Sequence, residues 1–377
     1  FNLNLMNTPS PNNTKLGGIQ LGFEDNATVS GNLINGITNT TSPDLFGITL
    51  GYTAISTTAF IGNEVTNSLV SYNKIDTVSN TGTFSAVGIG VANAYTGTNT
   101  LYNNMISGVF ANGTSGDYGS GIFLGGGANS TTKVYFNTVS MSGTGTGGAS
   151  PTYALAIGGV QPNIDARNNI LVSTGNNGTG FNLAIGLAYI GTSGNYLNLT
   201  SDNNDLFVSG TSSGVGVTGS LAGTPALTGV LRQSLTDWKT ETGKDNNSKN
   251  VLPEFISASD VHLLANGVNN NNSIIGMGVT IAGITNDYDC EIRPSSPAIG
   301  ADQFPCTFTP AALTFVENSG NLPNDGVICI GASVTVVASG GVSYVWNTTE
   351  TSSTITKNPV INTTYTVTVT NSAGCTG

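Results

Sequence analysis

The sequence predicts an all-β protein in which a parallel β-solenoid is followed by a small antiparallel β-sandwich. The solenoid is indicated by a tetrad of the form Gly or Ala, apolar, any residue, apolar, which occurs six times and is each time followed by a lone asparagine. The tetrads begin at Gly18, Gly47, Gly88, Gly121, Ala154 and Ala184. The asparagines are Asn32, Asn73, Asn104, Asn137, Asn169 and Asn204, at successive intervals of 41, 31, 33, 32 and 35 residues. Short period-2 apolar runs repeating at this length, without helical periodicity between them, are typical of a parallel β-solenoid.

The phase of the repeat predicts which side chains form the core. The residue two places after each asparagine is always apolar, and the residue three places before it is apolar except at Ser201. Because strand residues alternate between faces, both sets should point inward and each asparagine should lie at a corner between two strands. We expect these asparagines to adopt left-handed backbone conformation and to hydrogen-bond, amide to amide, from coil to coil. Their predicted role is therefore structural.

Composition excludes several functional classes. Charged residues make up 8% of the chain, and 51 of its 377 residues are Gly, which favours short strands and tight turns over a disordered, highly charged segment. The net charge is −11, and Lys and Arg together number 10, so a nucleic-acid partner is not expected. No apolar run is long enough to span a bilayer, and no N-terminal signal segment is seen. We expect any export signal to have been removed or to lie upstream.

Four cysteines predict disulfides rather than a metal site. They lack a Cys-x-x-Cys spacing, and the chain has a single histidine, His262. Of the three possible connectivities we prefer Cys290–Cys306 with Cys329–Cys375, which keeps each bridge within one domain. Two disulfides would place the protein in an oxidising, extracellular compartment.

The regular repeat runs from the first residue to about residue 210. Phe1 falls in the slot of an asparagine, 31 residues before Asn32, so the chain should begin within a coil. A helix is predicted over residues 234–242, opened by a capping Ser and closed by Gly243. Short strands around 255–256, 261–263, 274–275 and 298–301 should then carry the solenoid to residue 306.

A second domain is predicted over residues 307–377. Alternating segments at 333–337, 343–346, 353–356 and 364–369 have the spacing of an antiparallel β-sandwich. Such a sandwich should end with one more strand beyond residue 377, and no cap precedes the first coil. We therefore expect the sequence to be a piece of a longer protein.

Motifs in the second half of the chain carry a resemblance to known families. They are Ser234-Leu235-Thr236-Asp237-Trp238, Asp260-x-His262-Leu263, Asp287-Tyr288-Asp289-x-Glu291 and Ala298-Ile299-Gly300-Ala301-Asp302. This part resembles the C-terminal region of secreted parallel β-helix proteins from Bacteroidota. The tail, with Ser343-Tyr344-Val345-Trp346 and Tyr365-Thr366-Val367-Thr368-Val369, resembles Ig-like repeats of large surface proteins from the same bacteria.

The resemblance implies a right-handed parallel β-helix over residues 1–306, with a capping region that contains the helix, and an Ig-like β-sandwich over residues 307–377. It also implies type IX secretion to the cell surface and a function in adhesion, matrix building or polysaccharide cleavage. Relatives usually carry Gly after the Asp-x-Asp motif. Here Cys290 stands in its place, which supports the bridge to Cys306.

The best candidate binding site is the outward column two places before the asparagines. It contains Ser30, Ser71, Tyr102, Tyr135, Arg167 and Asp202. Stacked coils would place Tyr102 against Tyr135, with Arg167 beside Tyr135 and Asp202 beyond, a platform suited to a sugar ring and its carboxylate. The competing interpretation is an aromatic and ion-pair ladder that stiffens a sheet, and we favour it.

The sequence supports a catalytic site less strongly than it supports this binding column. A lyase needs a basic residue beside a carboxylate cluster, and Lys15, Lys74, Lys133 and Arg167 share no such column. For a hydrolase, only Asp165, Asp202 and Asp205 approach one another in the repeat. The alternating Asp287, Asp289 and Glu291 could hold calcium, although a solvated acidic turn is the preferred interpretation and no cofactor is required. His262 has no nearby nucleophile and should be structural.

We therefore expect a non-enzymatic extracellular structural or adhesive surface protein, part of a larger chain and of a filament or matrix. The alternative is a carbohydrate-binding or polysaccharide-cleaving β-helix that uses the Tyr102 column. Expected partners are other copies or other domains of the same surface protein, or a polysaccharide. The outward tetrad positions are uncharged and mostly small, with Phe123 the one bulky side chain, so this sheet should pack sideways on another surface.

Overall fold

The structure is a computed structural model. It describes residues 5–6, 17–40, 44–52, 64–93, 96–112, 117, 119–142, 150–175, 180–190, 196–221, 228–264, 271–303, 311–320 and 322–370. The chain divides into two compact units, Phe1–Arg293 with Ala298–Gln303, and Pro294–Pro297 with Phe304–Gly377. The first unit ends at Gln303.

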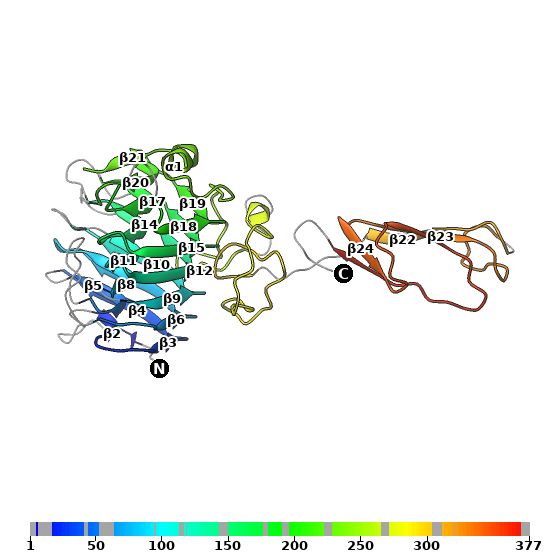
Figure 1. The fold of residues 1–377 in the computed structure, drawn as a ribbon, viewed down its shortest axis with the longest axis horizontal. Coiled ribbons are helices and arrows are strands. Elements are labelled where there is room, and N and C mark those ends of the chain that lie inside the picture. Colours follow the sequence, from blue (N-terminus) through cyan, green and yellow to red (C-terminus); the bar gives the residue numbers. More distant parts are fainter. Residues whose placement is uncertain are drawn as a thin grey trace. The chain divides into compact units, whose positions relative to one another are not determined.

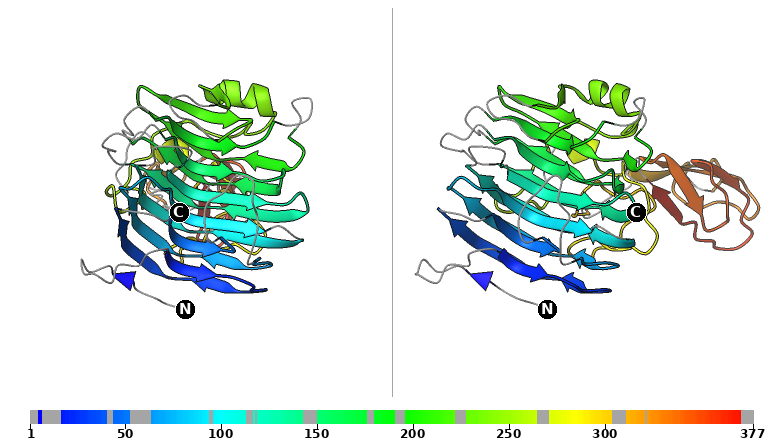
Figure 2. Two further views of the ribbon diagram at one scale, coloured as in Figure 1. Left: turned by 90° about the vertical axis from the view of Figure 1, so that its left-hand side faces the viewer. Right: turned by 60° about the vertical axis from the view of Figure 1, so that its left-hand side comes forward.

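The first unit is a parallel β-solenoid of about five turns, in which each turn contributes a strand to three sheets (Figures 1 and 2). Sheet A contains β1 (Leu5–Met6), β4 (Leu33–Asn39), β7 (Lys74–Asn80), β10 (Met105–Ala111), β13 (Thr138–Met141), β16 (Ile170–Ser173) and β19 (Asp205–Val208). Sheet B contains β2 (Gly17–Leu21), β5 (Leu45–Leu50), β8 (Ala86–Asn93), β11 (Gly119–Gly126), β14 (Thr152–Ile157), β17 (Asn182–Leu187), β20 (Ser213–Thr218) and the antiparallel β21 (Val230–Arg232). Sheet C contains β3 (Thr28–Ser30), β6 (Leu69–Ser71), β9 (Gly97–Tyr102), β12 (Ser130–Tyr135), β15 (Asn163–Arg167) and β18 (Leu199–Asp202).

The strand register places equivalent residues of successive coils above one another. The column of residues two places after the asparagines is paired coil to coil and is fully buried; it consists of Ile34, Ile75, Ile106, Val139, Leu171 and Leu206. A small residue opens each tetrad because this column packs against it: a Cβ added to Gly88 would lie 2.7 Å from Ile106 Cγ2. The predicted position of Phe1 is wrong by two residues, since Leu5 rather than Leu3 pairs with Ile34. A shift of two keeps every side chain on the same face.

The six repeat asparagines form a continuous ladder of buried amides at the corner between sheets C and A. The Nδ2 group of each donates to Oδ1 of the next, from Asn32 to Asn204, over 2.9, 2.9, 2.8, 3.1 and 3.0 Å. Each of these Oδ1 atoms also accepts the backbone N–H of the preceding ladder residue. The amides therefore satisfy backbone groups that burial would otherwise leave unpaired.

The expectation of left-handed backbone at these asparagines is wrong by one residue. The positive φ angles belong to the residues immediately before them: Gly31, Tyr72, Asn103, Phe136, Asn168 and Asn203, with φ between 51° and 68°. A corner therefore uses two residues, one that turns the backbone and one whose amide enters the interior. The turning residues project from the corner, and several of them bind the segment that follows the solenoid.

The predicted helix closes the upper end of the stack. Helix α1 (Leu235–Thr242) begins at Ser234 with a capping box to Asp237 and ends at Gly243, whose φ is 67°. Trp238 is fully buried, and its ring carbons would lie 2.4 to 2.6 Å from a Cβ on Gly216 of β20. The last ladder amide, that of Asn204, donates to Asp245 Oδ1 over 3.1 Å, while Trp238 Nε1 donates to Asp245 Oδ2 over 2.8 Å.

A long irregular segment then runs back along the outside of the solenoid, and we call it the strap (residues 251–264, 271–293 and 298–303; yellow in Figure 1). The strands predicted in it are wrong. Of its described residues, only 271–273 form a regular element, the 3-10 helix η1 (Asn271–Ser273), and the remaining pairing is limited to isolated bridges such as Phe255 with Leu263. The apolar side chains that suggested strands instead pack on sheet A, where Val261 and Ala301 cover Met105.

The strap is fastened to the turning residues of the corner. Asn168 Nδ2 donates to the carbonyl of Val279 over 2.7 Å, and Arg293 Nη2 donates to Asn103 Oδ1 over 2.9 Å. The Arg293 guanidinium also lies 3.9 Å from the ring centroid of Phe136. Its burial lowers the pKa of Arg293 to about 10, against the opposing effect of the nearby carboxylates.

The outer face of sheet B is covered, contrary to expectation. Thr49, Phe123 and Ala156 on this face are buried, within or beside a second apolar cluster that includes Tyr52, Tyr153 and Leu221. The small outward residues are required by this cluster, because a Cβ on Gly186 would lie 2.5 Å from the Tyr153 ring. The covered part of this face, from Thr49 to Gly186, is therefore not free to pack sideways on another molecule, whereas Gln20 of β2 is exposed.

The second unit is built from two small antiparallel sheets. One has the order β22 (Ala311–Val316), β23 (Val334–Ser339), β25 (Thr354–Lys357), and the other pairs β24 (Ser343–Trp346) with β26 (Val367–Thr370). The last four of these strands match predicted segments, whereas β22 was not predicted. Val336, Ala338 and Ile355 pack against Trp346 and Val369 to form the core of this unit.

The start of the strap buries a carboxyl group that gives a prediction about pH. Asp205 in β19 is fully buried; Oδ1 accepts the Val251 N–H over 2.9 Å, and Oδ2 contacts no donor among the described residues. Burial raises the pKa of Asp205 from 3.8 to about 7. Because this pKa is higher in the folded state, folded protein binds more protons between about pH 4 and pH 7, and the free energy of unfolding falls as pH rises through that range.

We therefore expect Asp205→Asn, a neutral substitution of the same shape, to raise the melting temperature at pH 8 and to reduce its fall between pH 5 and pH 8. The half-buried Asp76 of β7 supplies the control Asp76→Asn, which should leave this fall unchanged. If the melting temperatures of wild type and Asp205→Asn fall equally between pH 5 and pH 8, the raised pKa does not belong to Asp205.

Candidate functional site

The outward column of sheet C lies in register, as its spacing requires. Tyr102 pairs with Tyr135, Tyr135 with Arg167, and Arg167 with Asp202. Tyr102 is half-buried, and its ring lies edge-on to that of Tyr72 with centroids 5.4 Å apart. The Arg167 guanidinium lies 5.3 Å from the Tyr135 ring centroid, beside Tyr135 as predicted. Ser30 and Ser71, at the start of the column, hydrogen-bond to each other over 3.1 Å.

The carboxylate that organises this column is Asp165, from the same strand as Arg167. Nε and Nη2 of Arg167 donate to the two Asp165 oxygens, each over 2.7 Å, and the Tyr135 hydroxyl donates to Asp165 Oδ2 over 2.6 Å. The bidentate contact with Asp165 raises the pKa of Arg167. Burial, reinforced by Asp165, raises the pKa of Tyr135 to about 12. The three side chains form a closed cluster that leaves neither the guanidinium nor the hydroxyl without a partner.

The carboxylates considered for hydrolysis have separate partners. Asp202 accepts the backbone N–H and the Nδ2 of Asn247, each over 2.7 Å. Asp205 lies on sheet A beneath the start of the strap, and Asp165 binds Arg167. The structure does not bring these three carboxylates together around one position where a substrate could bind.

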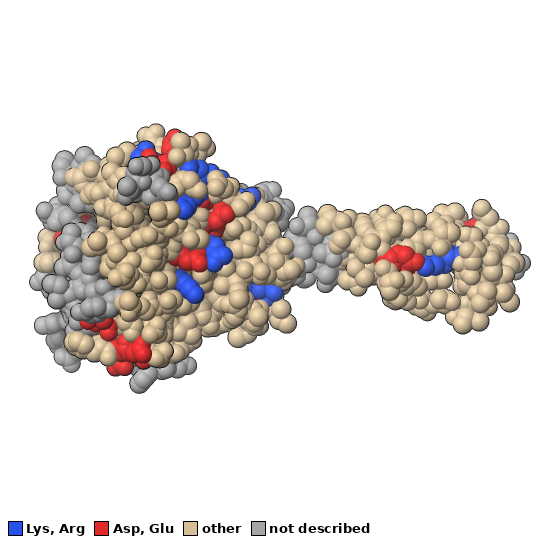
Figure 3. Space-filling view, in the orientation of Figure 1, with Lys and Arg blue, Asp and Glu red and all other residues tan. Residues whose placement is uncertain are grey.

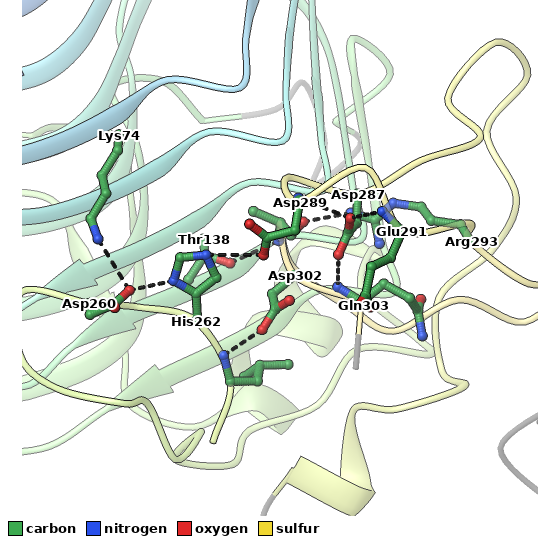
Figure 4. Close-up of polar contacts among 12 residues, drawn as sticks. Lys74, Thr138, Asp260, His262, Asp287, Asp289, Glu291, Arg293, Asp302 and Gln303 are labelled. Atoms are coloured by element: carbon green, nitrogen blue, oxygen red, sulfur yellow. Dashed lines mark hydrogen bonds and ion pairs between the residues drawn. The ribbon is translucent and has the colours of Figure 1, made fainter. Parts of the chain in front are cut away.

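A second cluster lies within the strap and contains a residue that the sequence analysis did not assign. Carboxylate oxygens of Asp287, Asp289 and Asp302 all lie within 4.8 Å of one another (Figure 4). Asp302 takes the place expected for Glu291, whose side chain is exposed and whose backbone N–H donates to Asp287. Burial raises the pKa of Asp302 to about 6 and also raises the pKa of Asp287.

The cluster continues to sheet A through a chain of polar contacts. His262 Nε2 lies 3.1 Å from Asp289 Oδ2, and His262 Nδ1 contacts Asp260 Oδ1. Lys74 of β7 forms an ion pair with Asp260 over 3.2 Å. Although burial acts in the opposite direction, the hydrogen bonds from His262 and Lys74 lower the pKa of Asp260. His262 thus links two parts of the strap.

The carboxylates of the acidic cluster already accept hydrogen bonds or ion-pair contacts from protein groups. Asp287 accepts three backbone N–H groups, from Asp289, Glu291 and Gln303, over 3.0, 2.7 and 2.6 Å. Leu263 N–H donates to Asp302, and His262 contacts Asp289. Calcium takes about six to eight oxygen ligands. Here the carboxylates already accept from protein donors, so the cluster is suited to holding separate parts of the strap together.

The cysteines leave the disulfide prediction open. Cys290 is exposed at a left-handed position with φ of 69°, where the sequence resemblance expects Gly, and neither Cys290 nor Cys329 forms a disulfide with another described residue. Their predicted partners, Cys306 and Cys375, lie outside the described residues. Both bridges remain predictions.

Comparison with known proteins does not assign the chain to a family. No protein-family model, no curated protein and no solved structure matches it. None of the helices in the described part of the chain is long and apolar enough to cross a membrane. The function must therefore be argued from the geometry.

The acidic cluster gives a prediction about metal dependence. Because its carboxylates accept protein N–H groups, we expect the melting temperature to change by less than about 1 °C between excess EDTA and millimolar calcium. Asp289→Asn supplies the control for any change that appears. If calcium raises the melting temperature of wild type but not that of Asp289→Asn, this account is contradicted and the cluster is a cation site.

Proposed function

We propose that the protein is a non-enzymatic extracellular structural or adhesive protein, in which the solenoid is a rigid support. The observation that carries this proposal is the closed cluster of Tyr135, Asp165 and Arg167 on the outer face of sheet C. A general acid or base must have a group available to exchange a proton with substrate. Here the best candidates bind one another, which is the behaviour of a ladder that stiffens a sheet.

The surface supports the same proposal. Lys, Arg, Asp and Glu are sparse on the face of the solenoid drawn in Figure 3. A surface with few charges attracts neither nucleic acid nor small ions strongly, and suits contact with neutral polymers or with other protein modules. We propose as partners other copies or other domains of the same surface protein, and as location the cell surface or the extracellular medium. Secretion by the type IX route and an Ig-like second unit are parts of this proposal.

A carbohydrate-active solenoid is the second candidate. It is favoured by the half-buried Tyr102, edge-on to Tyr72, next to the cation–π contact between Arg167 and Tyr135. Aromatic faces beside a guanidinium are suited to sugars that carry a carboxylate. This candidate requires Arg167 to leave Asp165, or the sugar to bind at Tyr102 alone.

One set of assays separates the two candidates. The full chain is incubated with neutral and acidic polysaccharides, and the release of reducing ends and of unsaturated uronic acids is followed. Beads coated with the chain are then tested for retention on polysaccharide surfaces and on beads carrying the same chain. We expect no product from any polysaccharide, and retention that is unchanged in Arg167→Met.

The same variant tests the structural role of the column. We expect Arg167→Met to lower the free energy of unfolding by about 1 kcal/mol, because Asp165 loses its bidentate partner at a half-exposed site. Lys133→Met, on the same face of sheet C, should have a smaller effect. Product formation that disappears in Arg167→Met or Asp165→Asn would sink the proposal and favour the enzyme.

A further inference from the structure

Side-chain contacts join the separate stretches of the strap, none of whose described residues belongs to a strand. The side chain of Asp302 accepts the backbone N–H of Leu263 over 2.7 Å, and that of Asp287 accepts the backbone N–H of Gln303 over 2.6 Å. These two bonds bring three stretches of the strap together (Figure 4). With three neighbouring side chains, the two carboxylates form a group that we call the clasp: Asp260, His262, Asp287, Asp289 and Asp302.

The closed strap is seated directly on the outer face of sheet A. A Cβ added to Gly300 would lie 2.5 Å from Ile170 Cδ1, so the strap backbone touches this side chain. The backbone N–H of Ala301 donates to Thr138 Oγ1 over 2.8 Å, and Ala301 also packs against Met105. Met105, Thr138 and Ile170 are fully buried. Opening of the strap would therefore uncover these three side chains of sheet A.

The clasp contains more carboxylates than the cations around it can balance. Oxygens of Asp287, Asp289 and Asp302 all lie within 4.8 Å of one another, and Asp287 and Asp302 are only 0% and 7% exposed. Like charges at such distances, with little water between them, repel one another. Among the described residues, the other titratable groups around the clasp are Lys74 of β7, Tyr72 of the corner, and Tyr288, Cys290, Glu291 and Arg293 of the strap. Four carboxylates thus face two cations.

The number of protons on the clasp depends on whether the strap is closed. Burial raises the pKa of Asp302 from 3.8 to about 6, and it also raises the pKa of Asp287. In an open strap both carboxyl groups would be exposed to water and would return to an ordinary pKa. The closed strap therefore binds more protons between about pH 4 and pH 6. Closing is favoured in acid, and this advantage is lost as the pH rises through about 6.

His262 acts in the same direction, because it lies between two carboxylates. Its Nε2 is 3.1 Å from Asp289 Oδ2, and its Nδ1 contacts Asp260 Oδ1. A neutral imidazole has one N–H and one acceptor nitrogen, so one of the two carboxylates would face an acceptor. Only the protonated ring donates to both, and imidazoles take up this proton between about pH 5 and pH 8. The contacts of His262 therefore also tighten in acid.

We propose that the clasp is a proton-operated fastening of the strap. Protonation of Asp302 and His262 closes the strap at mildly acidic pH, and their deprotonation lets it open locally above neutral pH while the coils stay folded. An irregular segment with few apolar contacts is the part of a fold that opens at the lowest free energy. Opening gives access to the outer face of sheet A at Met105, Thr138 and Ile170. This inference goes beyond the proposed scaffold and does not depend on it.

Hydrogen–deuterium exchange of the full chain tests the proposal. Exchange is followed by mass spectrometry at pH 5 and pH 8 in excess EDTA, and the rates are corrected for the effect of pH on unprotected amides. In wild type, the protection factor of strap peptides that contain Leu263 or Glu291 should fall at least about tenfold from pH 5 to pH 8. At both pH values these peptides should exchange before those of β12 and β15, because the opening is local.

Two variants separate a proton switch from a merely structural contact. Asp302→Asn stays neutral at every pH and keeps an oxygen for the Leu263 N–H, so it should protect the strap better than wild type at pH 8. His262→Gln cannot gain a charge, so it should protect the strap less than wild type at pH 5 and equally at pH 8. The control Glu254→Gln changes a strap carboxylate outside the clasp, and its protection factors should stay within about twofold of wild type.

Four results would overturn the proposal. Equal protection of the wild-type strap at pH 5 and pH 8 would show that closing takes up no proton. Exchange of the strap together with β12 and β15 would assign the opening to global unfolding. Lower protection in Asp302→Asn than in wild type at pH 8, in a variant with wild-type circular dichroism, would make Asp302 a structural acceptor only. Should Asp302→Asn fail to fold, His262→Gln still decides, because protection equal to wild type at pH 5 contradicts the proposal.

Discussion

The fold depends on one chain of buried amide hydrogen bonds. Each ladder asparagine donates forward to the next, so the direction is the same from Asn32 to Asn204 and the last donor needs an acceptor beyond it. Asp245 meets that need, because a carboxylate accepts at both oxygens and can bind Asn204 and Trp238 together. An asparagine there would present one oxygen and one NH2 group, so either Asn204 or Trp238 would face a donor instead of an acceptor. The ladder thus fixes where the stack of coils ends and where the helix that covers it begins.

The corner that holds the ladder also organises the outside of the molecule. Since the ladder residue turns its amide inward, the residue before it turns the backbone and projects from the corner. Asn103, Phe136 and Asn168 use this position to bind the strap, which then covers sheet A. With sheet B covered by its own apolar cluster, sheet C is left as the half-exposed polar face of the solenoid. That face carries the closed cluster around Asp165, and this is why we favour a support over an enzyme.

The sequence predicted features that repeat and missed features that depend on a single long-range contact. The asparagine intervals and the apolar positions around them determined the coils, and Ser234 with Gly243 determined the helix, because each signal is local. The turning position was misplaced because its occupants are chemically mixed, from Gly31 to Phe136, and show no pattern. Strap residues around Val261 were mistaken for strands because a short apolar run cannot reveal which surface it will cover. Asp302 was not assigned to the acidic cluster because only the closure of the strap brings it to Asp287.

The ladder is tested most directly by removing one amide from its middle. Asn137 donates to Asn169, Leu101 and Tyr135 and accepts from Asn104, so Asn137→Ala leaves several buried groups unpaired. Asn35, exposed on β4, gives the control Asn35→Ala. Chemical denaturation should show that Asn137→Ala lowers the free energy of unfolding by about 3 kcal/mol and that Asn35→Ala changes it by less than about 0.5 kcal/mol. Equal stability of the two variants would contradict the central role of the ladder.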